Sequence, residues 1–103
     1  MNELTSIFGL CRRSGNLSTG FEAAKDAILS GKAKAVFAAA DISDKTFKEL
    51  VFFTNGKDIT VQRLTEDIQT LSAAVGTKTG IVSVNDAGFA ARARELYKGG
   101  HSL

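Results

Sequence analysis

The sequence contains no proline and no tryptophan, and it has one cysteine and one histidine among 103 residues. The single cysteine excludes an intramolecular disulfide and a cysteine-based zinc site, and the single histidine excludes metal sites with several histidine ligands. His101 stands beside two glycines near the C-terminus, a poor position for the ordered base of a Ser-His-Asp or Cys-His site. The composition therefore argues against most classes of enzyme, and nothing in it indicates a cofactor or a metal.

Long hydrophobic runs are also missing. The longest unbroken apolar run covers residues 35–40, six positions, whereas a helix that crosses a bilayer needs about 20. The N-terminus carries an acidic residue, Glu3, and the apolar stretch over residues 7–11 is too short for a signal peptide. Together with the lone thiol of Cys11, these absences predict a cytoplasmic protein that does not engage membranes.

The residues that are present suffice for one hydrophobic core. Apolar residues make up 44% of the chain and charged residues 23%, a balance that excludes disorder. A length of 103 residues corresponds to one domain. We therefore expect a single domain over residues 1–103, with a loose tail over residues 98–103.

Helical and strand-like patterns alternate along the chain. A capping box of Thr19 and Glu22 predicts one helix start, and Ser43 and Thr65 predict two more. The last helix begins at Asn85 or Asp86 and ends at the glycine pair before His101. The patterns predict helices over residues 4–13, 19–30, 43–55, 65–76 and 86–99, and strands over residues 35–40, 59–61 and 81–84, with residues 16–18 as a connector or strand fragment.

This alternation predicts an α/β fold, a three-layer α-β-α sandwich on a small mixed or mostly parallel sheet with helices on both faces. Residues 35–40 are apolar throughout, which is typical of a central strand buried on both faces, although their alanines leave a helix open as an alternative. Cys11 falls on the apolar face of the first helix, so we expect a buried thiol rather than a nucleophile.

No group of residues has the pattern of a catalytic site. Gly15 and Gly20 bracket a turn that leads into a helix, but they match neither G-x-G-x-x-G nor a Walker A sequence. The acidic pair at residues 66–67 stands at a helix start, where acids stabilise the helix dipole. Glu22 and Asp26 lie four residues apart with no nucleophile near them. We therefore expect no enzymatic activity.

The charge pattern indicates an anionic partner. The net charge is +2, and residues 11–34 hold five basic residues against two acidic ones. Gly20 has no Cβ, so a ligand could approach its backbone closely at the start of a helix flanked by Arg and Lys. The alternatives are a solvated basic surface and an ordinary first-turn glycine. The residues at this junction of two predicted helices are Arg12, Arg13, Asn16, Thr19, Gly20 and Lys25.

Several segments carry a family resemblance. Residues 10–20 (LCRRSGNLSTG) and 27–34 (AILSGKAK) resemble the kink-turn-binding ribosomal proteins of the 7Ae/30e type, and the small bacterial YlxQ-like proteins most of all. The later segments AAAD at 38–41, LSAAVG at 71–76 and VSVNDAGFA at 82–90 agree in order and spacing. The resemblance covers nearly the whole chain.

The resemblance implies an α-β-α sandwich that binds RNA without catalysis. In that family the N-terminus of the second helix enters a sharply bent RNA duplex, and a second loop closes over an extruded nucleotide. The implied partners are structured RNA, either a kink-turn or ribosomal RNA, and ribosome- or translation-associated proteins. The resemblance and the basic residues of the segment 11–34 together indicate a set of candidate RNA-binding residues. They are Arg12, Arg13, Gly15, Asn16, Thr19, Gly20, Glu22, Lys25, Lys32, Thr77, Lys78 and Thr79.

The helix motif departs from the family pattern and keeps a second hypothesis open. The family motif Gly-x-Asn-Glu-x-x-Lys stands here as GFEAAKD over residues 20–26. Ala23 cannot hydrogen-bond a base, and Asp26 occupies the lysine position. These two residues favour a protein-interaction module on the same fold. The basic residues favour RNA binding, namely Arg12, Arg13, Lys32, Lys34 and Lys78.

Overall fold

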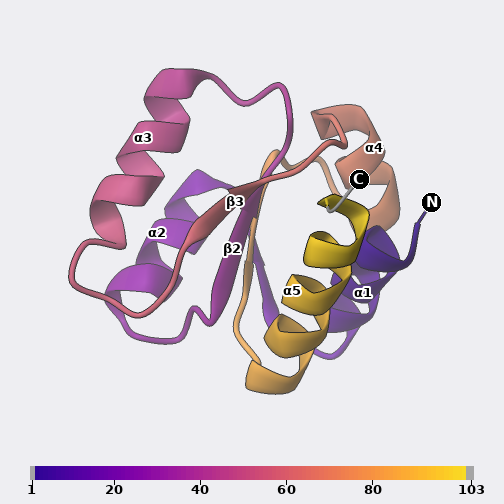
Figure 1. Ribbon diagram of the computed structural model, residues 1–103, viewed down its shortest axis with the longest axis horizontal. Coiled ribbons are helices and arrows are strands. Elements are labelled where there is room, and N and C mark those ends of the chain that lie inside the picture. The colour runs from indigo at the N-terminus through magenta and orange to yellow at the C-terminus, as the bar shows by residue number, and fades with distance from the viewer. Residues whose placement is uncertain (1, 102–103) are drawn as a thin grey trace.

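The structure is a computed structural model that describes residues 2–101, with the side chains of residues 2–97. Helices and strands alternate along it, as the sequence pattern predicts (Figure 1). The elements are α1 (Glu3–Arg13), β1 (Leu17–Thr19), α2 (Phe21–Leu29), β2 (Ala35–Ala38), α3 (Asp44–Phe53), β3 (Val61–Arg63), α4 (Ile68–Val75), β4 (Ile81–Val84) and α5 (Ala87–His101).

The four strands form one mixed sheet in the order β1-β4-β2-β3. Strand β4 runs antiparallel to both of its neighbours, with Val82 opposite Thr19 of β1 and Phe37 of β2. Only β2 and β3 are parallel. The sheet is therefore mixed, as predicted, and it is not mostly parallel, because the chain inserts β4 between β1 and β2.

Helices cover both faces of this sheet, which confirms the α-β-α sandwich. In Figure 1, α2 and α3 lie on one side of the strands and α1, α4 and α5 lie on the other. Strand β2 is buried along its whole length, and its residues alternate between the two cores. Phe37 packs with α1, α4 and α5, whereas Val36 packs with α2 and α3. The prediction of a central strand is confirmed for residues 35–38.

Cys11 is fully buried on the inner face of α1, as predicted. Its Sγ donates to the carbonyl oxygen of Asn16 at 3.1 Å, and burial raises the pKa of the thiol to about 11. Because only the thiolate attacks, we expect the native protein at pH 8 to react on the order of 100-fold more slowly with a thiol reagent than the urea-unfolded chain. Timed absorbance during labelling measures both rates. Equal rates in the two states would contradict this burial.

Among the helix starts predicted after β2, two are correct in kind and one is wrong. Ser43 caps α3, and its side chain accepts from the backbone N–H of Thr46. Thr65 does not cap α4. The cap is Asp67, whose Oδ1 accepts from the N–H of Thr70 at 2.8 Å, and this bond lowers the pKa of the carboxyl. For α5 the sequence leaves Asn85 or Asp86 as the cap, and the side chain of Asp86 is the one that accepts from the N–H of Phe89.

Helix α4 begins later than the sequence predicts because the residues before it are hydrogen-bonded to the segment that includes the end of β2. The N–H of Leu64 donates to the carbonyl of Ala38, and the carbonyl of Glu66 accepts from the N–H of Ala40. The chain therefore stays bonded to the segment after β2 through residue 66. A helix capped at Thr65 would take the Glu66 carbonyl into its own hydrogen bonds and break the bond to Ala40.

The C-terminal helix is longer than expected. Helix α5 continues to His101, past the two glycines at which the sequence predicts its end. Glycine lowers helix propensity by about 1 kcal/mol relative to alanine but does not forbid helical dihedral angles. Of the expected loose tail over 98–103, residues 102–103 and the side chains of 98–101 lie outside the described residues. Across the described helices, none is both long and apolar enough to cross a membrane.

Candidate nucleic-acid interface

Gly20 connects β1 to α2 and has a backbone that other residues avoid. Its φ is 94° and its ψ is 163°, a combination open almost only to glycine. No atom lies within 4 Å of the position that a Cβ would occupy. Gly20 is the N-cap of α2 and supplies no side-chain cap for the first N–H groups of the helix.

The predicted capping box at this helix is wrong. Thr19 is the last residue of β1, where it pairs with Val82 of β4, and it cannot also begin the helix. Glu22 is consequently an exposed first-turn residue of α2, where its charge complements the helix dipole.

The loop between α4 and β4 meets the start of α2 at one atom. The carbonyl oxygen of Ile81 accepts from the backbone N–H of Gly20 at 2.9 Å and from the Thr79 hydroxyl at 2.6 Å. Ser72 of α4 holds the loop from the other side, since its hydroxyl accepts from the Thr79 N–H at 2.9 Å. The two segments that the family resemblance selects are therefore linked through one backbone carbonyl.

Within this loop the three candidate residues have different surroundings. Thr79 is buried, 5% exposed, and its polar atoms are used inside the protein. Thr77 is half-buried and Lys78 is exposed. Lys78 is thus the exposed cation of the loop, while Thr79 fixes the position of the loop.

The arginines at the end of α1 lie near the same loop. Arg12 Nη1 donates to the carbonyl oxygen of Val75 at 3.3 Å, at the end of α4 where the loop begins. A Cβ on Gly76 would stand 3.3 Å from this nitrogen. Arg12 therefore connects α1 to the base of the loop and keeps much of its side chain exposed, and Arg13 is exposed beside it.

Gly15 and Asn16 are separated from Gly20 by the length of β1. At about 3.3 Å per residue, Asn16 lies roughly 13 Å from Gly20 along the chain. Gly15 has a φ of 81° and completes the turn after α1. The Asn16 side chain donates to the Ser14 hydroxyl at 3.0 Å, and the backbone carbonyl of Asn16 accepts from the Asn85 N–H at 2.8 Å. Both residues build the turn at the opposite end of the strand.

Lys25 and Lys32 are also displaced from the start of α2. The Lys25 ammonium lies 5.0 Å from the centre of the Phe53 ring, a cation–π contact that directs it toward α3. Lys32 follows the far end of α2, and that end is about 13 Å from Gly20 at 1.5 Å per helical residue. The structure therefore brings together Thr19, Gly20, Glu22 and residues 77–79, with Arg12 and Arg13 beside the loop.

The acidic residues of the two pairs lie at the start of a helix or on exposed surface. Asp67 of the pair at 66–67 is occupied as a helix cap, and Glu22 and Asp26 are exposed on α2. Nowhere in the described part do three His, Cys, Asp or Glu residues gather into a possible metal site. Among the same residues, every buried side-chain nitrogen and oxygen has a hydrogen-bond partner, so none is held ready for a ligand.

Sequence reasoning did not single out the two residues that join the interface. Ile81 contributes only backbone groups, and Ser72 is a small polar residue within a helix. Neither has a side-chain pattern that marks it in the sequence. The pairing of β1 with β4 is what positions the Ile81 carbonyl beside Gly20.

Comparison with known proteins identifies similar chains. The RNA-binding protein YlxQ of Enterococcus faecium is 30% identical over 94 residues, which cover 91% of this chain and 90% of that protein. A solved structure of a protein of unknown function from Bacillus halodurans superposes with a TM-score of 0.89 at 27% identity, over 95% of this chain and 99% of that one. No protein-family model matches the sequence.

A more distant solved structure shares the fold. The 15.5kD RNA binding protein of Giardia lamblia superposes with a TM-score of 0.75 at 18% identity. The match covers 96% of this chain and 91% of that one. At this identity the likeness concerns the arrangement of helices and strands alone.

Proposed function

The chain belongs to the YlxQ family within the 7Ae-type superfamily, and from this premise we propose that it is a non-catalytic RNA-binding protein of the cytoplasm. It contacts structured RNA, a kink-turn or a fold of ribosomal RNA, through the start of α2 and the loop over residues 76–80. Its protein partners are then those of the ribosome or of translation.

One observation carries this proposal, namely the carbonyl of Ile81 that accepts hydrogen bonds from both Gly20 and Thr79. This shared acceptor fixes the Cβ-free helix start against the loop that bears exposed Lys78. An anion that approaches Gly20 meets backbone N–H donors at the positive end of a helix. The cations of Lys78, Arg12 and Arg13 supply the attraction to neighbouring phosphates.

A gel-shift titration tests the proposal with a kink-turn RNA and an unkinked duplex at two salt concentrations. We expect tighter binding to the bent RNA. Affinity falls with salt by about 0.7–0.9 logarithmic units per decade of salt for each phosphate contact, because binding releases counterions. Equal affinity for the two RNAs would contradict specific recognition, and no binding at low salt would contradict the function altogether.

Replacing Lys78 measures how much this loop cation contributes to the affinity for RNA. Lys78→Ala should weaken binding to every RNA by a similar factor and reduce the salt slope by about one unit, since a phosphate contact carries no sequence information. Lys45→Ala is the matched control, because Lys45 is equally exposed but lies on α3, away from the interface. A Lys78→Ala slope equal to that of the control would remove Lys78 from the interface.

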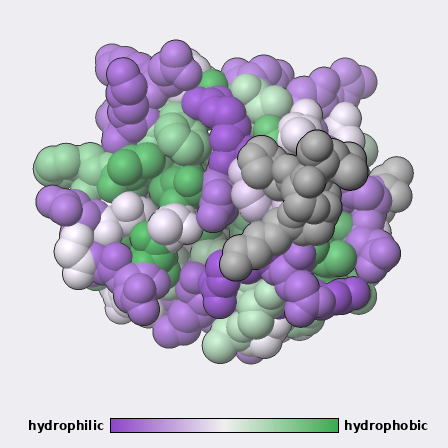
Figure 2. Space-filling view, in the orientation of Figure 1, coloured by the Kyte–Doolittle hydropathy of each residue, from purple (hydrophilic) through white to green (hydrophobic). Residues whose placement is uncertain are grey.

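A protein-interaction module is the second candidate function, favoured by an exposed apolar surface on α3. Phe52 is 70% exposed and Val51 is 44% exposed. In Figure 2 hydrophobic atoms gather on the side of the molecule where α3 lies. Asp26 and Ala23 in the helix motif agree with this function, because neither favours contact with RNA. Absence of any preference for bent RNA in the gel shift would make this the leading candidate.

A further inference from the structure

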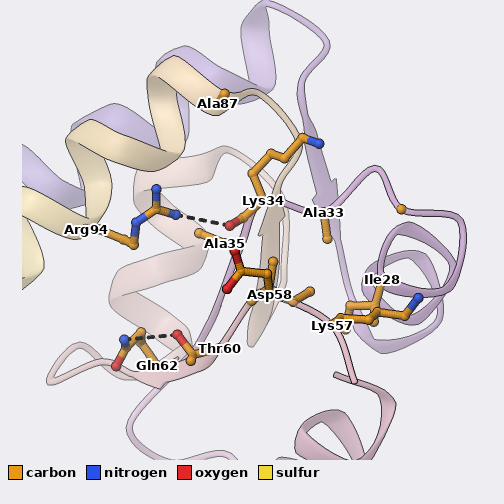
Figure 3. A pocket seen from close by; sticks show the side chains of 12 residues that line it. Ile28, Ala33, Lys34, Ala35, Lys57, Asp58, Thr60, Gln62, Ala87 and Arg94 are labelled. Atoms are coloured by element: carbon orange, nitrogen blue, oxygen red, sulfur yellow. Dashed lines mark hydrogen bonds between the residues drawn. The ribbon is translucent and has the colours of Figure 1, made fainter. Parts of the chain in front are cut away.

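A hollow of about 850 Å³ lies at the end of the sheet opposite Gly20, where β2 and β3 begin (Figure 3). The end of α2, the segment 57–60 and the start of α5 form its walls. Its volume falls within the range of roughly 300–1,000 Å³ typical of small-molecule and cofactor sites. The proposed contact with RNA at Gly20 does not use it.

The polar groups of the hollow comprise one carboxylate and three cations. In Figure 3, Asp58 lies between Arg94 on one side and Lys57 on the other, and the side chains of Lys34 and Lys57 extend outward from the rim. Arg94 Nη1 donates to the Lys34 carbonyl at 3.1 Å, which holds the guanidinium at the edge of the hollow. Three cations against one anion leave an excess of two positive charges, enough to attract a phosphate.

The remaining walls suit the flat, apolar faces of a nucleobase. Half-buried Ile59 supplies the apolar surface at the wall, and fully buried Ile28 supports the floor from within the core without being accessible to a ligand. Gln62 donates to the Thr60 hydroxyl at 3.3 Å, so this pair presents further hydrogen-bonding groups at the lower wall. A carboxylate accepts hydrogen bonds from exocyclic amino groups of bases, as in contacts of Asp or Glu with the N4 amino group of cytosine.

From this combination we infer that the hollow binds one unpaired nucleotide of the RNA, with an amino-bearing base at Asp58 and its phosphate at the rim cations. The inference rests on the proposed function and adds a second contact to it. The two contacts are separated by the length of α2, about 13 Å. The protein then contacts RNA at both ends of the sheet, and it selects RNAs whose single-stranded segment lies beside the bent helix.

Nucleoside monophosphates test the hollow without RNA. We expect CMP, which carries an exocyclic amino group, to shift the backbone amide resonances of Ile59, Thr60 and Gln62 and to bind about tenfold tighter than UMP, which has none. Asp58→Asn should remove most of this difference, because the neutral amide offers only one acceptor oxygen and adds donors. Equal titrations by CMP and UMP, or shifts confined to residues near Gly20, would overturn the role of the hollow.

The double variant Lys34→Ala/Lys57→Ala tests the RNA contact, since both side chains are exposed. We expect about tenfold weaker RNA binding and a salt slope lower by about 1.4–1.8 units, the loss of two phosphate contacts. The matched control is Lys45→Ala/Lys48→Ala, which removes two exposed cations of α3. Thermal melting of both variants checks that the fold is intact.

The outcomes separate the inference from the proposed function. If wild type binds RNA and the two double variants bind it equally, the second contact is overturned and the function stands. If CMP shifts the amides of the hollow but no RNA binds, the hollow takes a free nucleotide and the RNA-binding function fails. If the Lys34→Ala/Lys57→Ala variant loses RNA affinity and the Lys45→Ala/Lys48→Ala control does not, the second contact is supported.

Discussion

Replacing Gly20 with alanine is expected to weaken RNA binding at least about tenfold and to lower the free energy of unfolding by about 1–3 kcal/mol. The space around a Cβ is open, so the cost comes from the backbone, because φ 94° and ψ 163° strain any residue with a side chain. Relief of the strain would rotate the first turn of α2 and displace its N–H donors. Urea unfolding and a gel shift measure the two effects.

A matched control separates the two effects of this substitution. Gly56 also has a positive φ, 77°, and open space around it, but it lies after α3 and outside the proposed interface. Gly56→Ala should lower the free energy of unfolding by about 1–2 kcal/mol and leave RNA affinity unchanged. If the two variants bind RNA equally well, the start of α2 is not the contact surface.

The second large effect is expected from Asp26→Lys, which should tighten binding to a kink-turn RNA about tenfold. Asp26 is exposed in the second turn of α2, and the family motif has lysine at this position. The change replaces an anion that repels phosphate by a cation that forms a charge-assisted hydrogen bond. The fold should hold, because Glu22 precedes the new lysine by four residues, a spacing that adds about 0.3–0.5 kcal/mol to helix stability.

Glu49→Lys is the control for this charge reversal. Glu49 is exposed on α3, and its replacement changes the net charge by the same amount. If added positive charge raises the affinity for RNA in general, the affinity rises in both variants and for straight and bent RNA alike. A gain restricted to Asp26→Lys and to bent RNA supports the orientation of α2 in the proposed complex, and equal gains would contradict it.

The local sequence determined most of the architecture. Helical spacing of apolar residues predicted which face of α1 buries Cys11, and the unbroken apolar run predicted that β2 is central. The cap at Ser43 was also predictable, because its hydrogen bond spans only three residues. Signals of this kind depend on neighbours in the chain, and so they are visible without the fold.

Contacts between distant segments decided the rest. Thr19 and Thr65 have the local pattern of helix caps, but Thr19 pairs with Val82 of β4. Thr65 lies between two residues, Leu64 and Glu66, whose backbones are hydrogen-bonded to Ala38 and Ala40. Lys25 turns to Phe53 on another helix, a contact that no spacing within α2 reveals.

The proposed interface itself depends on the tertiary structure. The sequence determined that Gly20 and Lys78 are candidates, since a residue without Cβ and a loop cation are properties of single positions. Their adjacency was decided by β4, which pairs with β1 and directs the carbonyl of Ile81 to Gly20 and Thr79 together. A backbone carbonyl is present at every residue, and therefore only its position in the folded sheet distinguishes this one.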